Sequence, residues 1–258
     1  MAVIDTKKYG WRPSRPDHRD LKYHAVQNLN LTAVSLPKMI DMEPKCPVVY
    51  DQLALGSCTA NAGGGLAQFL MMKLGKWVYR PSRLAIYYWE RVLEGTVGED
   101  AGASIRDCMK VMASIGVPPE HMWEYKIEKF KQAPPRAVYD FAQNHKVGQY
   151  SRLNNTKVKE LKYCLATGFP FIFGFSVYDS FESDVIQSTG VLPMPGKYET
   201  LLGGHAVMAV GYDDDTKLFK IRNSYGPEWG KRGYFYMPYD FITDTDLAAD
   251  FWTAQYVA

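Results

Sequence analysis

Cysteine, net charge and long apolar runs are all scarce in this sequence. It contains four cysteines, and no two of them form a CxxC pair. Four scattered cysteines are too few for a disulfide-stapled scaffold or a structural zinc site. The formal net charge is only +2, so we expect no nucleic-acid partner and no charged lipid surface as a partner.

No apolar run approaches the roughly 20 residues that a membrane helix needs. Residues 1–11 are polar, carry Lys7 and Lys8, and are not followed by the apolar segment of a secretory signal. We therefore expect no membrane partner, and a protein that is cytoplasmic or exported by a non-classical route. The hydrophobic share of 47% and the charged share of 22% are typical of a soluble globular protein.

The first part of the chain is expected to form an extended arm rather than a domain. Prolines at 13, 16 and 37 interrupt it, and it shows little apolar periodicity. The aromatic residues Tyr9, Trp11 and Tyr23 indicate that the arm docks on the body of the protein, because a fully solvated tail has little use for them. We predict an arm over residues 1–36 and one large domain over residues 37–258.

Helical signals dominate the first half of that domain. Residues 56–74 have a helical apolar pattern, although the triplet Gly63 to Gly65 costs about 1 kcal/mol per glycine relative to alanine. Ser104 and Asp107 form a capping box that opens another helix and places Cys108 in the core. Further helices are predicted over residues 82–94, 135–144 and from 156 to about 167.

Beyond residue 170 the apolar pattern changes from a helical period to a period of two residues. Strands are predicted over residues 171–178, 206–212, 218–222 and 233–237, and the middle pair is joined at residues 213–216 as a hairpin. The aspartates at 213, 214 and 215 lack the spacing of a calcium loop, so a solvated turn explains them better than a metal site. Helices followed by strands predict an α+β fold.

One cysteine and one histidine lie in contexts that suit nucleophilic catalysis. A thiol needs a group that lowers its pKa and one that protonates the leaving group, and a histidine can do both. Cys58 follows Gly-Ser and lies in the predicted first turn of a helix, where the helix dipole favours a thiolate. His205 follows two glycines at the start of a predicted strand.

Two amide side chains could complete this site. Asn223 follows the next strand and could accept a hydrogen bond from Nδ1–H of His205, which would fix the ring without adding a negative charge. Gln52 precedes Cys58 by six positions and could help the backbone N–H of Cys58 to stabilise an oxyanion. The other histidines, His18, His24, His121 and His145, have no partners at informative spacing.

The segments DQLALGSC (51–58), GHAV (204–207) and NSYGPEWGKRGY (223–234) resemble the three motif blocks of papain-family cysteine peptidases, in the same order. The interval 205 − 58 = 147 lies within the roughly 130–150 residues expected for the histidine, whereas 223 − 58 = 165 is slightly longer. The sequence departs from the usual motifs of this family at three positions, Leu55, Thr59 and Tyr225. The motif Gly-Ser-Cys-Thr-Ala-Asn is closer to bacterial and viral branches of the family.

The resemblance implies a two-lobed fold with the active site in a cleft between the lobes. The helical lobe would span about residues 45–130, and an antiparallel, β-barrel-like lobe would span about residues 131–258. Cys58 would come from the first lobe, with His205 and Asn223 from the second. The implied activity is that of an endopeptidase without a cofactor, which acts on peptide or protein substrates. We expect a monomer.

The resemblance also suggests substrate contacts and two shielding residues. Gly102 and Ala103 would pair with an extended substrate. Ile105, Gly203 and Gly204 would surround the pocket for the second residue before the cut, which we expect to be apolar. Tyr225 and Trp229 would shield the bond between His205 and Asn223. The arm could be a short inhibitory pro-segment, although it lacks the long helical pattern of better-known ones.

Two other functions use the same residues. A catalytically silent papain-like module would bind peptides without turnover, and an acyl transferase would pass the acyl group to an amine instead of water. The complete set of Cys58, His205, Asn223 and Gln52 favours hydrolysis. Cys46 and Cys164 could be buried thiols, or one of them could form a bridge.

Overall fold

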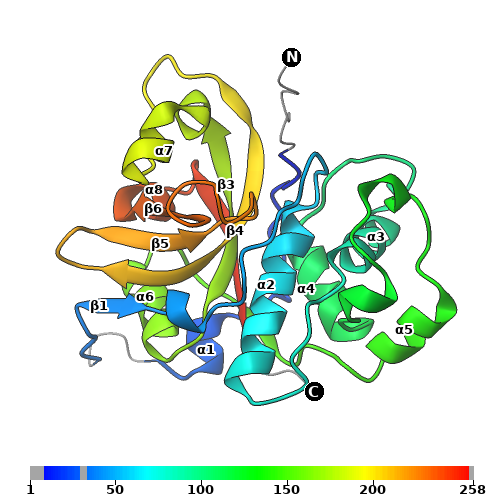
Figure 1. Ribbon diagram of the computed structural model, residues 1–258. Coiled ribbons are helices and arrows are strands. Elements are labelled where there is room, and N and C mark those ends of the chain that lie inside the picture. The colour runs from blue at the N-terminus through cyan, green and yellow to red at the C-terminus, as the bar shows by residue number, and fades with distance from the viewer. Residues whose placement is uncertain (1–8, 30–33, 256–258) are drawn as a thin grey trace.

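The computed structural model describes residues 9–29 and 34–255. Lys7, Lys8 and the rest of residues 1–8 of the predicted arm lie outside the described residues. The helices α3 (Arg83–Glu94), α4 (Ile105–Ser114) and α5 (Arg136–Ala142) lie on one side of α2 (Cys58–Lys73), and an antiparallel sheet lies on the other side together with the remaining helices (Figure 1). The predicted α+β class is therefore confirmed.

Most predicted helices are found close to their predicted limits. Ser82 accepts a hydrogen bond from the backbone of Ala85 at the start of α3 (Arg83–Glu94). The capping box is present, because Ser104 accepts from the backbone N–H of Asp107 at 3.1 Å and opens α4 (Ile105–Ser114). The other helices are α1 (Tyr23–Val26), α5 (Arg136–Ala142), α6 (Val158–Ala166), α7 (Asp184–Thr189) and α8 (Tyr239–Thr243).

The sheet has the order β2-β7-β3-β4-β5-β6, and β1 also pairs with β4. Its strands are β1 (Met39–Asp41), β2 (Tyr150–Arg152), β3 (Phe171–Tyr178), β4 (Leu201–Asp213), β5 (Leu218–Arg222), β6 (Tyr234–Pro238) and β7 (Ala248–Ala254). The predicted hairpin joins β4 to β5. Within the described chain the edge strands β2 and β6 do not pair with each other, so the sheet is open rather than closed into a barrel.

The glycine triplet lies inside an unbroken helix, because each glycine faces a close neighbour. A Cβ at Gly63 would lie 2.4 Å from the sulfur of Cys108, and a Cβ at Gly65 would lie 3.4 Å from Arg222. Close packing of α2 against α4, β4 and β5 therefore compensates for the low helix propensity of glycine. This packing fixes the helix that carries Cys58 against the strand that carries His205.

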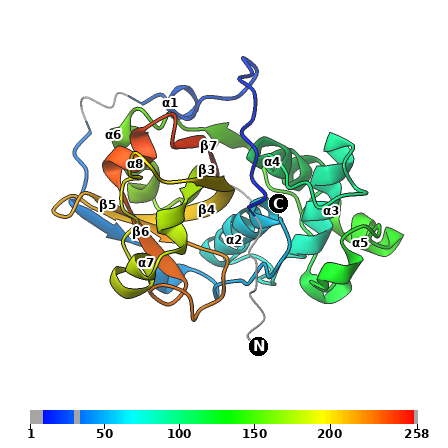
Figure 2. The same ribbon diagram turned by 90° about the horizontal axis from the view of Figure 1, so that it is seen from above.

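The described part of the arm runs between the sheet and the helices α2 and α4 (Figure 2). Trp11 forms a parallel bridge with Ala103, and Lys22 forms one with Arg152. Asp20 pairs with both Arg106 and Arg152, at 2.7 and 3.0 Å. The arm is thus docked on both parts of the molecule.

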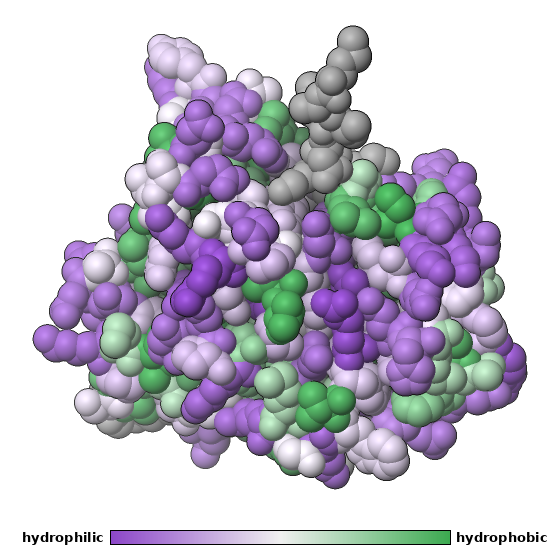
Figure 3. All heavy atoms as spheres, in the orientation of Figure 1, coloured by the Kyte–Doolittle hydropathy of each residue, from purple (hydrophilic) through white to green (hydrophobic). Residues whose placement is uncertain are grey.

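The visible face of the molecule carries apolar side chains only in small, scattered groups among hydrophilic ones (Figure 3). In the part of the chain that the structure describes, no helix has both the length and the apolar character needed to cross a membrane.

Candidate active site

Cys58 is the first residue of α2, and it is fully buried. Burial raises the pKa of its thiol to about 11, while backbone hydrogen bonds from Ala206 and Gly10 lower it. A backbone group that stabilises a thiolate must do so through its N–H. The sulfur therefore faces the strand β4 at the residue after His205, and it also faces the arm at Gly10.

His205 lies within β4, and Asn223 directly follows the neighbouring strand β5. Nε2 of His205 lies 2.8 Å from Oδ1 of Asn223, and the same oxygen accepts a hydrogen bond from the backbone N–H of Ser224 at 2.8 Å. The expectation that Nδ1 makes the bond to Asn223 is therefore wrong. Packing orients the ring so that Nε2 points toward Asn223. Nδ1 is then the nitrogen left to exchange a proton with a thiol.

Aromatic rings surround His205. The ring of Tyr225 is stacked on it with centroids 4.9 Å apart, and Trp229 contacts Tyr225 edge-on at 5.5 Å. Phe175 and Phe181 also pack against the imidazole. These rings exclude water from the bond between His205 and Asn223, which strengthens that bond.

Gln52 lies beside the same group of residues. Its Oε1 accepts a hydrogen bond from Oγ of Ser224 at 2.6 Å, and its Nε2 donates to the carbonyl of Leu55 at 3.0 Å. The backbone N–H of Gln52 donates to the carbonyl of Ser224 at 2.9 Å. The segment that carries Gln52 is thus tied directly to the segment that carries Asn223.

Arg83 supports this arrangement, and the sequence analysis did not single it out. Its guanidinium is almost fully buried and donates to the carbonyl of Asp51 at 3.0 Å and to Oδ1 of Asn61 at 2.9 Å. It also stacks on the ring of Tyr125, whose hydroxyl donates to the carbonyl of Gln52 at 2.9 Å. A planar cation with several donors suits this role.

Glu90 is a second buried group that the sequence analysis missed. Oγ1 of Thr59, the residue after Cys58, donates to its carboxylate at 2.8 Å. Burial raises the pKa of Glu90 to about 8, and Cys108 and Thr59 oppose that rise. Glu90 is therefore mostly protonated near neutral pH, and where it ionises its charge raises the pKa of the Cys58 thiol.

The arm contacts the positions that were predicted to bind substrate. The N–H of Ala103 donates to the carbonyl of Gly10 at 2.8 Å, and the N–H of Trp11 donates to the carbonyl of Gly204 at 2.9 Å. The backbones approach so closely that a Cβ at Gly102 would lie 1.9 Å from the carbonyl oxygen of Gly10. Among the other predicted contacts, Tyr9 packs on Gly203, and Ile105 is buried at the start of α4.

Asp250 in β7 also reaches the arm, and the sequence analysis missed it. Its Oδ2 accepts hydrogen bonds from the backbone of Ser14 at 2.6 Å and from Nε1 of Trp11 at 3.3 Å. Burial raises the pKa of this carboxyl. A single acidic residue within the apolar run of residues 247–254 was the signal that could have identified it.

The other cysteines lie outside this site or serve in packing. All four cysteines are free thiols, so neither Cys46 nor Cys164 forms a bridge. Cys108 is buried against Gly63, as predicted for a core residue. In the described ranges, no group of three or more His, Cys, Asp or Glu residues could hold a metal ion.

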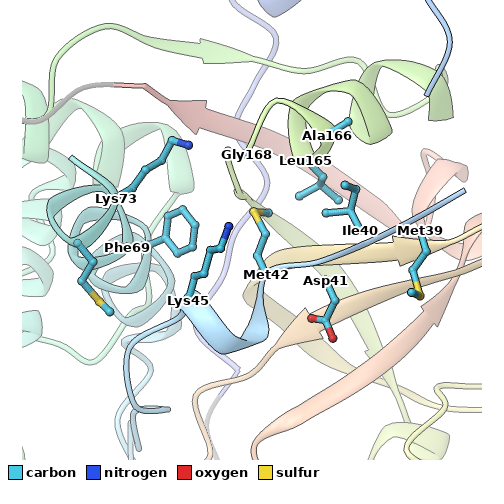
Figure 4. A pocket seen from close by; sticks show the side chains of 11 residues that line it. Met39, Ile40, Asp41, Met42, Lys45, Phe69, Lys73, Leu165, Ala166 and Gly168 are labelled. Atoms are coloured by element: carbon cyan, nitrogen blue, oxygen red, sulfur yellow. The ribbon is translucent and has the colours of Figure 1, made fainter. Parts of the chain in front are cut away.

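A separate cavity of about 670 Å³ lies at the other end of α2 (Figure 4). It is lined by β1, by Phe69 and Lys73 of α2, and by Leu165 at the end of α6. It contains none of the residues predicted for catalysis.

The geometry can be compared with known proteins. The papain family cysteine protease model matches residues 36–250. An uncharacterized peptidase C1-like protein of Acanthamoeba polyphaga mimivirus is 40% identical over 98% of this chain and 88% of that protein. Xylellain, a cysteine protease from Xylella fastidiosa, is 41% identical with a TM-score of 0.88, over 98% of this chain and 97% of the other. Procathepsin L2 from the larval midgut of Tenebrio molitor shares the fold at 18% identity, with a TM-score of 0.73 over 99% and 81% of the two chains.

Proposed function

This chain belongs to the papain family of cysteine proteases and is a cysteine-type peptidase, and we propose that Cys58 is its nucleophile. The sulfur of Cys58 attacks the carbonyl carbon of a peptide bond, and His205 then protonates the leaving amine. Asn223 holds the imidazole through its bond to Nε2. Water hydrolyses the resulting thioester, with His205 acting as the base.

The negative charge of the tetrahedral intermediate needs preorganised donors. The backbone N–H of Cys58 lies at the start of α2, where the helix dipole also favours negative charge. Nε2 of Gln52 is the second donor: one of its two N–H groups donates to the carbonyl of Leu55, and the other serves the oxyanion. Two donors of this kind typically contribute several kcal/mol to the stabilisation of the transition state.

The path of the arm supports internal cleavage rather than cleavage at a chain end. Tyr9, Gly10 and Trp11 pass over Cys58 and His205, and the polypeptide continues beyond Trp11 toward Asp20. A chain can therefore lie across these residues without presenting a terminus to them. We propose an endopeptidase that acts on extended peptides or protein segments as a monomer.

We also propose that the arm, residues 1–36, inhibits the enzyme. The single observation that carries this proposal is the backbone pairing of the arm with the predicted substrate positions: the N–H of Ala103 donates to the carbonyl of Gly10 at 2.8 Å, and the N–H of Trp11 donates to the carbonyl of Gly204 at 2.9 Å. Trp11 pairs in parallel with Ala103, whereas the family resemblance implies that a substrate would pair antiparallel there. The arm therefore runs in the reverse direction to the expected substrate.

Labelling with a thiol-directed inactivator tests the nucleophile. We expect an epoxide or vinyl-sulfone inactivator to modify Cys58, with faster labelling once the arm is displaced, and Cys58→Ala to abolish peptide cleavage without loss of the fold. Cys46→Ala is the matched control, because Cys46 lies outside the site and should be dispensable. A Cys58→Ala protein with undiminished peptidase activity contradicts the proposal.

Mass spectrometry of the products separates hydrolysis from the two other functions. In both reactions the carboxy-terminal fragment leaves with a free amine. Hydrolysis then releases the amino-terminal fragment with a new carboxylate, whereas acyl transfer joins that fragment to an added amine. A silent binding module leaves the peptide intact while holding it.

A further inference from the structure

The segment between the two proposed oxyanion donors is a tight turn. Residues 52–58 connect Gln52 to Cys58, whose side-chain and backbone N–H groups respectively are proposed to stabilise the oxyanion. Within this turn Leu53 has a left-handed backbone, with φ of 55°. A left-handed non-glycine residue costs energy and persists only where the surrounding structure holds it in place. The relative position of the two donors therefore depends on contacts from outside the turn.

Tyr125 makes such a contact at both ends of the turn. It lies in the loop that follows the short 3-10 helix Glu120–Met122. Its hydroxyl donates to the carbonyl of Gln52 at 2.9 Å and lies 2.5 Å from Oγ of Ser57, the residue before Cys58. One phenol oxygen thus joins the beginning of the turn to its end.

Arg83 fixes the direction of the hydrogen bonds at this contact. A guanidinium can only donate, so Oδ1 of Asn61 accepts from it at 2.9 Å, and Nδ2 of Asn61 donates to Oγ of Ser57 at 3.0 Å. A carbonyl can only accept, so Tyr125 donates to Gln52. The bond between Ser57 and Tyr125 is therefore donated by the serine, which completes a series of donors from Arg83 to Gln52. Hydrogen bonds in such a series strengthen one another.

Ser57 is the N-cap residue of α2, and within the described residues its side chain makes no capping bond to that helix. A serine at this position commonly accepts a hydrogen bond from a backbone N–H of the first turn. Here the hydroxyl is used for the contacts with Asn61 and Tyr125 instead. The side chain of Ser57 thus ties the start of α2 to Tyr125.

The ring and the hydroxyl of Tyr125 are held by different partners. Cζ of Arg83 lies 4.0 Å from the centroid of the ring, and Glu120 holds the guanidinium through two contacts of 3.0 Å. Burial raises the pKa of Tyr125 to about 12, so the hydroxyl keeps its proton near neutral pH. Removal of the hydroxyl alone therefore leaves the stacking of the ring in place.

On the basis of the proposed function, we propose that Tyr125 is a positioning residue for the oxyanion site. It acts through Gln52 and Ser57, and it fixes the separation between Nε2 of Gln52 and the backbone N–H of Cys58. Donors that are fixed in advance stabilise the charge of the tetrahedral intermediate, and they must lie about 2.7–3.1 Å from its oxygen. A change in their separation therefore slows peptide cleavage.

Two reactions of Cys58 in the full chain test this inference. Peptide cleavage, measured as kcat/KM with a quenched peptide, passes through an oxyanion. In alkylation by iodoacetamide the sulfur displaces iodide and no oxyanion forms. We expect Tyr125→Phe to lower the ratio of cleavage to alkylation at least about fivefold, which is part of the roughly 100- to 1,000-fold that loss of a whole donor costs. The arm limits the access of both reagents to Cys58, so its effect cancels in the ratio.

Tyr79→Phe is the matched control. It removes a phenol hydroxyl that donates to the carbonyl of Val117 at 2.7 Å, away from the turn, and it should leave the ratio unchanged. Ser57→Ala interrupts the same series of hydrogen bonds and serves if Tyr125→Phe does not fold; its ratio should fall as well. The double variant should lose little more than the larger single loss, because the two hydroxyls act as a unit.

An unchanged ratio in Tyr125→Phe overturns the positioning role. An equal fall of cleavage and alkylation also overturns it, because a general loss of structure affects both reactions. A parent protein that is alkylated at Cys58 but cleaves no peptide contradicts the proposed function instead.

Discussion

In the proposed mechanism, Asn223 holds one atom of the histidine. Its Oδ1 bonds Nε2 of His205 at 2.8 Å in a buried, ring-lined environment. The two motif blocks located both residues in the sequence. The motifs could not show which ring nitrogen bonds Asn223, because that choice depends on how Tyr225 and Phe175 pack on the imidazole.

We expect Asn223→Ala to lower kcat by about 10- to 150-fold, with little change in KM. The imidazolium loses a hydrogen bond worth about 1.5–3 kcal/mol, and each 1.36 kcal/mol corresponds to a tenfold change in rate. Steady-state kinetics with a quenched peptide measures the effect. Asn155→Ala, which removes an amide that bonds the carbonyls of Ile242 and Ala248, is the control for loss of a structural asparagine. A loss as complete as that of Cys58→Ala contradicts an orienting role.

At the scale of the element, docking of the arm requires close contact between its backbone and the loop before α2. The absence of a side chain at Gly10 lets the arm approach the loop before α2, because a Cβ there would lie 1.8 Å from the carbonyl oxygen of Gly56. Only a shift of the arm can relieve such a clash, since the neighbour is backbone. The docked position of the arm, and with it the proposed inhibition, therefore depends on the absence of a side chain at Gly10.

Gly10→Ala should raise the basal peptidase activity of the full chain several-fold and speed the alkylation of Cys58. The methyl group displaces the arm, which lessens the burial that raises the pKa of Cys58 to about 11. Initial rates with a quenched peptide and with iodoacetamide report the two effects. Gly98→Ala is the matched control, because its Cβ would meet nothing within 4 Å. Equal activity of the two variants argues against inhibition by the arm.

The elements differ in how far the sequence predicts them. Caps and helical periodicity located the major helices, and alternation located the four strands β3, β4, β5 and β6. The strand β7 was missed because residues 247–254 form an apolar run with one aspartate and no alternation. The contact of Asp250 with the arm was missed for a related reason, since it depends on a bulge against β3, about 75 residues away in the sequence.

At the scale of the whole molecule, burial of Glu90 couples folding to pH. Burial raises its pKa from the usual 4.5 to about 8. A carboxyl group that is neutral when folded stabilises the protein fully below the pKa of the unfolded chain. That contribution declines as the pH rises and is lost above about 8. Thr59 and Cys108 face this carboxyl, and Glu94 and Asp107 lie near it.

Glu90→Gln should remove much of this dependence. The amide keeps an acceptor for Thr59 but does not ionise, so the melting temperature of the variant should fall less than that of the parent between pH 5 and pH 8.5. Each pKa unit corresponds to about 1.4 kcal/mol of stability, or several degrees in Tm. Glu99→Gln, at an exposed position, should follow the parent. If the melting temperature changes with pH in the same way for all three proteins, Glu90 does not couple folding to pH.

The covalent continuity of the arm with the body has a consequence for how this protease could be switched on. A tethered segment is present at an effective concentration of the order of millimolar for a short connection, whatever the number of molecules in solution. If the arm inhibits as proposed, dilution after synthesis therefore cannot free Cys58. Only a cut in the tether, or a competitor bound more strongly than the segment itself, can do so.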